Sequence, residues 1–131
     1  HAMHLYRNNF RPSEAMPKPE GVVCVWALVA DTEEEAWRLF ESRVRWKLDR
    51  NLGRIGALLP PEQAERDYSA SEQRTLTELK ENALVGTAKQ VVSKLRALAE
   101  RLQIEEIVVI TWTHDPAAQA RTYELLAQEI F

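Results

Sequence analysis

The residues with the clearest potential for chemistry follow an apolar segment near the C-terminus. Trp112, Thr113 and His114 come directly after residues 107–110, a β-branched run that is typical of a buried strand. In α/β folds, ligands bind at the loops that follow the strands. A tryptophan there can form the wall of a pocket, and a histidine can donate a hydrogen bond or transfer a proton. The alternative is that Trp112 belongs to the core and that His114 is a solvent-exposed residue at a helix start.

A second candidate is the dipeptide Gly86-Thr87, which precedes a helical segment with a clear apolar stripe. Free N–H groups at the start of a helix can bind a phosphate group. The alternative is an ordinary helix cap, because Thr87 and Gln90 stand at the spacing of a capping box. The sequence leaves both interpretations open.

The residue pattern gives no support to a nucleophilic triad or a metal site. Cys24, His114 and Asp115 have suitable types for a triad, but Cys24 lies within an apolar run, whereas a reactive thiol needs an exposed electropositive environment. We therefore expect Cys24 to be a small core residue in a protein from a reducing compartment. Because His1, His4 and His114 do not cluster in the sequence, we expect no metal.

Composition and charge narrow the class of protein. The 131 residues are 45% hydrophobic and 28% charged, with a formal net charge of −3, which is typical of one globular domain over residues 1–131. A basic footprint for nucleic acid is absent. The longest apolar run, residues 22–30, is too short to span a membrane. We therefore expect a cytoplasmic domain that binds neither nucleic acid nor membranes.

Two segments, residues 22–30 and 104–111, are predicted to be strands. Both are apolar without regular alternation, which is typical of parallel strands that are buried on both faces. The connection between two parallel strands of one sheet is expected to be right-handed. Since both strands then run in the same direction, the loops after Ala30 and Trp112 are expected to open at the same edge of an α/β fold.

Helical segments with recognisable start signals surround these strands. The signals are the capping pairs Thr32/Glu35, Ser69/Glu72 and Thr87/Gln90 and the dipeptide Asp115-Pro116. Basic residues in the later part of the first of these helices, at positions 43, 45, 47 and 50, suit the helix dipole. Residues 1–10 resemble the last turns of a helix, and a proline-rich connector follows. In the last helix we expect an inward face of Ala120, Tyr123, Ala127 and Ile130.

Three stretches of the chain resemble the C-terminal third of bacterial luciferase-like monooxygenases. They are Leu5-Tyr6-Arg7 through Phe10-Arg11-Pro12-Ser13 with the strand end Ala30-Asp31-Thr32, then Leu84-Val85-Gly86-Thr87 with Gln90-Val91, and then Glu106-Ile107-Val108-Val109 with Thr113-His114-Asp115-Pro116 and Arg121-Thr122-Tyr123. Their order and spacing carry the resemblance. Two turns depart from the family pattern, with Ala88 where a proline often follows Gly-Thr and Gln103-Ile104 where a glycine usually stands.

The resemblance implies a TIM-type (β/α)8 barrel of more than twice this length. Residues 22–30 would correspond to strand seven and residues 104–111 to strand eight, so the chain would be a C-terminal fragment of the barrel. Enzymes of this family bind reduced FMN or a related deazaflavin at the C-terminal face of the barrel and act on small organic substrates. Because most flavin contacts come from strands that this chain lacks, we expect the fragment to bind no cofactor. Trp112, which could contact the flavin ring, would stay at the rim with Thr113 and His114.

Two functions remain open at this stage. The chain is either a segment of a flavin-dependent monooxygenase, not catalytically competent alone, or a non-catalytic α/β module kept for dimerisation or regulation. It starts at His1 without an initiator methionine, and we expect it to be a piece of a longer protein. Two strands cut from a barrel have free edges, so we also expect a homodimer. An alternative remedy is a helix, such as residues 72–83, folded over the open face.

Overall fold

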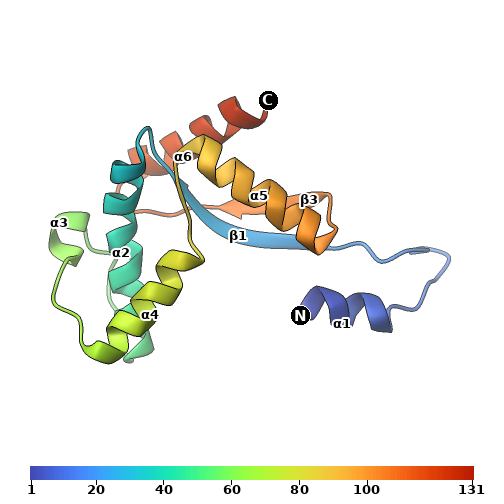
Figure 1. Cartoon of the computed structure of the whole chain (residues 1–131), viewed down its shortest axis with the longest axis horizontal. Helices are drawn as coiled ribbons and strands as arrows, with labels where there is room; N and C mark the ends of the chain where they lie inside the picture. The colour runs from blue at the N-terminus through green and yellow to red at the C-terminus, as the bar shows by residue number, and fades with distance from the viewer.

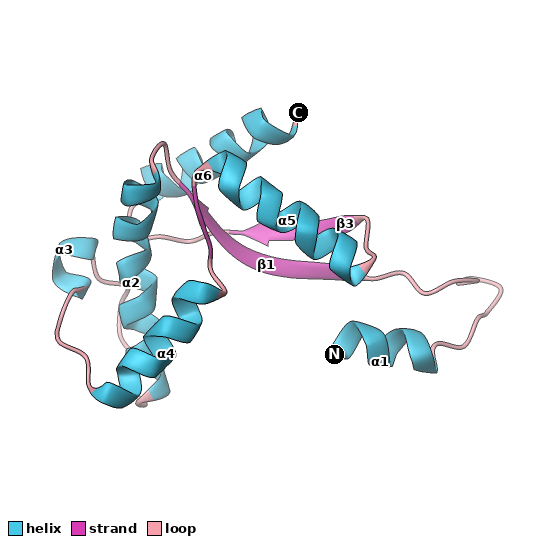
Figure 2. Cartoon of the chain, in the orientation of Figure 1, coloured by secondary structure: helices cyan, strands magenta, loops and turns pink.

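The computed structural model describes all 131 residues as six helices and three strands (Figures 1 and 2). The elements follow in the order α1 (Ala2–Asn9), β1 (Val22–Val29), α2 (Glu33–Asn51), α3 (Pro61–Ala64), α4 (Ala70–Glu81), β2 (Leu84–Gly86), α5 (Ala88–Leu102), β3 (Glu106–Ile110) and α6 (Pro116–Ile130). The predicted α/β class is confirmed. None of the helices combines the length and the apolar character that crossing a membrane requires.

The three strands form one parallel sheet in the order β2-β1-β3. The central strand β1 pairs with β3 over residues 22–26 and with β2 over residues 27–29. The two predicted strands are present with slightly shorter bounds. The prediction of only two strands is wrong, because β2 is a third. Three residues carry too little pattern to be recognised as a strand, and the pairing with β1 is what defines this one.

Helices cover the two faces of the sheet unequally. Helices α5 and α6 cover one face with a core of Ala27, Val29, Val91, Val92, Leu95 and Leu126. Helix α2 packs against the other face, and α4 packs against α2. The core on this side consists of Leu28, Ala30, Ala36, Leu39, Phe40, Val44, Leu48, Ala83 and Val85. This second core contacts only the C-terminal half of β1. In Figure 1, α2 and α4 lie beside that end of β1, whereas α5 runs along the sheet.

The prediction that both strands are buried on both faces is therefore wrong outside the C-terminal half of β1. Val22 is 53% exposed, and Val108 and Ile110 of β3 are 42% and 43% exposed. Cys24, expected in the core, is exposed as well. Cys24 pairs with Val108 and therefore lies on the same face of the sheet. This face of the sheet has no second layer where α2 and α4 end. We call its exposed residues Val22, Cys24, Val108 and Ile110 the bare sheet face.

The predicted helix starts are confirmed. Thr32 Oγ1 accepts a hydrogen bond from the backbone N–H of Glu35 at 3.2 Å, and Ser69 forms a capping box at the start of α4. Asp115 Oδ1 accepts from the N–H of Ala117 at 2.9 Å, ahead of a helix that begins with proline. These ends form as predicted because the donors and acceptors stand within a few residues of each other.

The predicted inward face of α6 is wrong by about one residue. Thr122 and Leu126 are buried, whereas Tyr123 and Ile130 are 43% and 46% exposed. The Thr122 hydroxyl accepts from the N–H of Val29 at 3.2 Å and donates to the Val29 carbonyl at 2.9 Å. Beyond the end of β3 these two backbone groups have no strand partner. Their need for hydrogen bonds turns a polar residue of α6 towards the sheet.

Candidate functional site

Aromatic side chains gather close to the C-terminal end of β3, on the side of the sheet that carries α2. The Trp112 ring lies 5.9 Å from the ring of Trp26 in β1 and 5.2 Å from that of Trp46 in α2, both edge to face. Phe40 of α2 extends the group, with its ring 5.7 Å from Trp26. The cluster thus joins the central strand, the first long helix and the loop after β3. Both predicted roles of Trp112, core residue and pocket wall, are compatible with this position.

Arg43 of α2 lies between two of these rings. Its Cζ is 4.1 Å from the centroid of Trp26 and 4.3 Å from that of Trp112, so the cation can interact with both ring faces. We call these three residues the Arg43 stack. Two buried donors in it, Arg43 Nη1 and Trp26 Nε1, have no hydrogen-bond partner. Burial without a counter-charge lowers the pKa of Arg43 to about 10, so the side chain stays charged at neutral pH.

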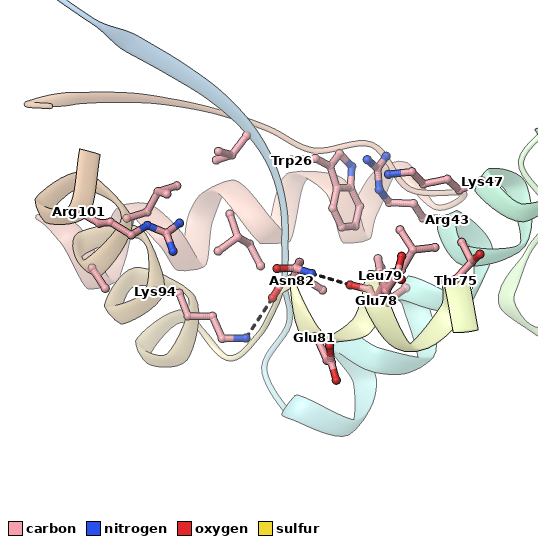
Figure 3. A pocket seen from close by; sticks show the side chains of 16 residues that line it. Trp26, Arg43, Lys47, Thr75, Glu78, Leu79, Glu81, Asn82, Lys94 and Arg101 are labelled. Atoms are coloured by element: carbon pink, nitrogen blue, oxygen red, sulfur yellow. Dashed lines mark hydrogen bonds between the residues drawn. The ribbon is translucent and has the colours of Figure 1, made fainter. Parts of the chain in front are cut away.

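An open groove of about 810 Å³ runs beside the Arg43 stack. It exists because β2 pairs only with residues 27–29, so the rest of β1 has no strand neighbour on this side. The lining residues are Val25, Trp26, Phe40, Arg43, Lys47, Thr75, Glu78, Leu79, Glu81, Asn82, Ala83, Leu84, Lys94, Ala97, Leu98 and Arg101. Figure 3 shows Arg43 and Lys47 close to Trp26 at one end, with Lys94 and Arg101 towards the other.

None of the three predicted residues of the loop after β3 lines the groove, although Trp112 belongs to the Arg43 stack beside it. Thr113 donates its hydroxyl hydrogen bond to the carbonyl of Asp115 and so belongs to the turn that starts α6. His114 is exposed in the same turn and is not among the lining residues. The sequence-based grouping of Trp112, Thr113 and His114 therefore separates in space, and only Trp112 contacts the aromatic cluster.

Gly86 and Thr87 form the cap of α5. The Thr87 N–H donates to Gln90 Oε1 at 2.8 Å, and the Thr87 hydroxyl lies 3.1 Å from the same oxygen. Gly86 has a φ of 146°, which favours glycine, and an added Cβ would lie only 2.5 Å from Gln90 Oε1. The geometry favours the cap over the phosphate site, since an N–H that would face a phosphate already has an acceptor.

Sequence reasoning missed Trp26, Trp46 and the special position of Arg43 and Lys47. The basic residues of α2 were interpreted only as a complement to the helix dipole. A usable signal existed: Arg43 and Lys47 are four residues apart and therefore share one face of the helix. That this face meets Trp26 and Trp112 depends on the packing of α2 against β1.

Comparisons with known proteins show what the chain is similar to. The chain is similar to the crystal structure of apo-MsnO8, with a TM-score of 0.81 and 25% identity over 98% of this chain and 40% of that one. It is 33% identical to a luciferase-like monooxygenase of Escherichia coli K12 over 95% of this chain and 37% of the relative. The uncharacterised protein YwcH of Bacillus subtilis is 37% identical over 96% of this chain and 38% of its own length.

The predicted resemblance is therefore confirmed, and the chain is related to luciferase-like monooxygenases over nearly its whole length. It spans somewhat more than a third of the length of these relatives. No model of a protein family matches the chain.

The Arg43 stack can be tested for its fit to the flavin that the resemblance implies. A flavin is a flat ring system with an anionic phosphate. Trp26 and Trp112 offer aromatic surface, and Arg43 supplies a positive charge with an unpaired donor. These groups suit one wall of a flavin pocket. The bare sheet face continues from this wall, because Trp26 pairs with Ile110 and lies on the same face of the sheet.

Proposed function

We propose that the chain is the C-terminal segment of a flavin-dependent, luciferase-like monooxygenase that acts on a small organic substrate. The observation that carries the proposal is the Arg43 stack close to the C-terminal ends of parallel strands, the edge at which barrel enzymes bind their ligands. The similarity to the monooxygenase of Escherichia coli supports it.

The sheet supports the barrel part of this proposal. β1 and β3 are adjacent parallel strands, as strands seven and eight of a TIM-type barrel would be. Helices α5 and α6 cover one face, like the outer helices of a barrel. The bare sheet face would then point into the barrel, where the remaining strands would cover Cys24 and Val108. The exposure of these apolar residues is thus what a segment of a barrel should display.

Reduced FMN would supply the reaction with oxygen, and a related deazaflavin would instead supply a hydride to the substrate. The residues of this chain would position and shield it. Trp112 and Trp26 would exclude water from one side of the ring, and Arg43 would balance negative charge. Thr113 and His114 would stay at the rim, where solvent reaches them.

The segment alone should not be catalytically competent. Ligand pockets of this kind bury about 70–90% of the surface of their ligand, and this chain offers one wall. We therefore expect FMN to bind the 131-residue chain with a dissociation constant well above about 1 µM, which corresponds to about −8 kcal/mol. Titration followed by flavin fluorescence measures it. Binding at or below that value would contradict the incompetence of the segment.

The monooxygenase itself is tested in the protein encoded by the complete reading frame. Flavin-dependent consumption of oxygen is expected there, and Trp112→Ala should weaken flavin binding. Arg74→Gln, on the exposed side of α4, is the matched control and should change nothing. A complete protein that neither binds flavin nor consumes oxygen with it would refute the proposal.

The bare sheet face favours a second candidate, a non-catalytic module for dimerisation or regulation. Val22, Cys24, Val108 and Ile110 present apolar surface that a second copy could cover. The reading frame upstream of His1 separates the two candidates. Further strand–helix units encoded there support the enzyme, whereas a start codon immediately upstream supports the module.

A further inference from the structure

Arg43 is a cation to which the chain supplies no anion. Two other arginines of α2 are paired, Arg38 with Glu35 and Glu62 and Arg45 with Asp49. No carboxylate lies within ion-pair distance of Arg43, and its buried Nη1 has no acceptor at all. A buried, unpaired charge is costly, and the two tryptophan rings offset only part of this cost. A counter-ion from outside the chain would supply what is missing.

Lys47 adds a second free cation at the same place. It stands one helical turn after Arg43, lines the same groove, and has no carboxylate partner. Figure 3 shows both side chains beside Trp26 at one end of the groove. A guanidinium and an ammonium group that converge in this way form a binding site for the head group of a small anion.

The rest of the groove indicates the body of such a ligand. Half of its sixteen lining residues are hydrophobic, among them Val25, Phe40, Leu79, Leu84 and Leu98. An inorganic ion would leave this apolar surface in contact with water. An organic acid with an apolar body would cover it and still place its charge beside Arg43.

The acidic residues of the groove do not occupy the cationic end. Glu78 and Glu81 of α4 line the groove, are exposed, and form no ion pair with Arg43 or Lys47. Figure 3 shows Glu81 pointing away from both. Lys94, which donates to the carbonyl of Ala83, lines the groove from α5. With Arg101 of α5, the lining contains four cations and two carboxylates, so its net charge is positive. The cations are Arg43, Lys47, Lys94 and Arg101, and the carboxylates are Glu78 and Glu81.

We propose that this groove binds a small organic carboxylate with an apolar body, and that Arg43 and Lys47 hold its carboxylate group. Trp26 and Trp112 are positioning residues that fix the guanidinium plane. This site needs no flavin and no residue beyond the 131 of the chain. It therefore goes beyond the proposed monooxygenase function, although it shares the Arg43 stack with the wall proposed for the flavin. Carboxylate binding by the 131-residue chain without flavin and flavin binding by the complete protein test the two proposals separately.

Titration of the 131-residue chain with hexanoate, in the absence of flavin, tests the site. Tryptophan fluorescence reports binding because Arg43 contacts two tryptophan rings. Hexanoate should give a saturable change, and hexanamide, which has the same body without the charge, should bind at least about tenfold more weakly. Inorganic phosphate should also bind more weakly than hexanoate, since it leaves the apolar lining uncovered.

Variants assign the binding to its residues. Arg43→Gln and Lys47→Gln should each weaken hexanoate binding, Arg43→Gln by about tenfold. Arg74→Gln, on the exposed side of α4 and outside the lining of the groove, is the matched control and should bind as the unchanged chain does. If Arg43→Gln loses its fold in circular dichroism, Arg43→Met replaces it, since it removes the charge but keeps a side chain that packs against the two tryptophan rings.

Three results would overturn the proposal. Equal binding of hexanoate and hexanamide would mean that the groove is only apolar. Unchanged binding by Arg43→Gln, or by Arg43→Met where that variant is used, would mean that the Arg43 stack is a structural cation–π contact. Tighter binding of phosphate than of hexanoate would exclude an apolar carboxylate as the ligand.

Discussion

Replacement of Thr122 by valine should destabilise the chain although the new side chain is nearly isosteric and more apolar. The Thr122 hydroxyl is fully buried and hydrogen-bonds both the N–H and the carbonyl of Val29. Valine would leave two buried backbone groups without partners. Each unsatisfied group costs about 1–3 kcal/mol, so we expect a loss of about 3 kcal/mol in the free energy of unfolding.

Two further variants separate the hydroxyl from the methyl group. Thr122→Ser keeps the hydrogen bonds and loses one buried methyl group, which should cost about 1 kcal/mol. Thr77→Val is the matched control, because the Thr77 hydroxyl is exposed and bonds only to the carbonyl of Gln73 in its own helix. That change should stay within about 0.5 kcal/mol.

Urea unfolding followed by circular dichroism measures these differences, provided that the slope of the transition is the same for all variants. The expected order of stability is the unchanged chain and Thr77→Val, then Thr122→Ser, then Thr122→Val. A valine variant as stable as the serine variant would refute the reasoning. The burial of Thr122 would then be a matter of volume, and its hydrogen bonds to β1 would contribute nothing measurable.

Three other predictions follow from the caps, charges and edges of the fold. Thr32→Ala should cost about 1 kcal/mol and Thr32→Ser much less; equal losses in urea would mean that the methyl group acts rather than the cap. A hydrogen bond from Arg66 lowers the pKa of Glu72 from 4.5 to about 2. The stability that this carboxylate contributes is therefore fully present above pH 4.5 and is lost as the pH falls towards 2. Glu72→Gln should flatten the pH dependence of the urea midpoint in that window, and the exposed Glu65→Gln should not; an unchanged slope in Glu72→Gln would contradict the assignment. We also propose that the chain is a dimer or larger at micromolar concentration, because the bare sheet face and the free edge of β3 lack partners. A monomer of 15.1 kDa in sedimentation equilibrium, together with a cooperative melting curve, would refute this.

Local signals were sufficient for the helix starts and for the two longer strands. The capping pairs Thr32/Glu35 and Ser69/Glu72 form as their spacing predicts. The parallel sheet follows from two apolar, β-branched segments separated by helices. These features depend on residues close together in the chain, which is why one sequence is enough to predict them.

The site was predicted only in part. Trp112 was recognised from its place after a strand, and it does lie in the aromatic cluster. Arg43 was taken for a helix-end charge, because nothing in its own segment indicates the rings of Trp26 and Trp112. Cys24 was expected in the core because its neighbours are apolar. Its exposure depends on how far α2 and α4 extend over the sheet.

The sequence by itself thus determined the class of fold, the helix starts and the resemblance to luciferase-like monooxygenases. Only the tertiary structure decided that β2 is a strand, that Thr122 rather than Tyr123 is buried, and that Arg43 is an unpaired cation between two tryptophans. The physical reason is the range of the interactions. A cap is satisfied within one turn, whereas strand pairing, the hydrogen bonds of Val29 and the position of Arg43 between Trp26 and Trp112 depend on groups that lie far apart in the chain and meet only after folding.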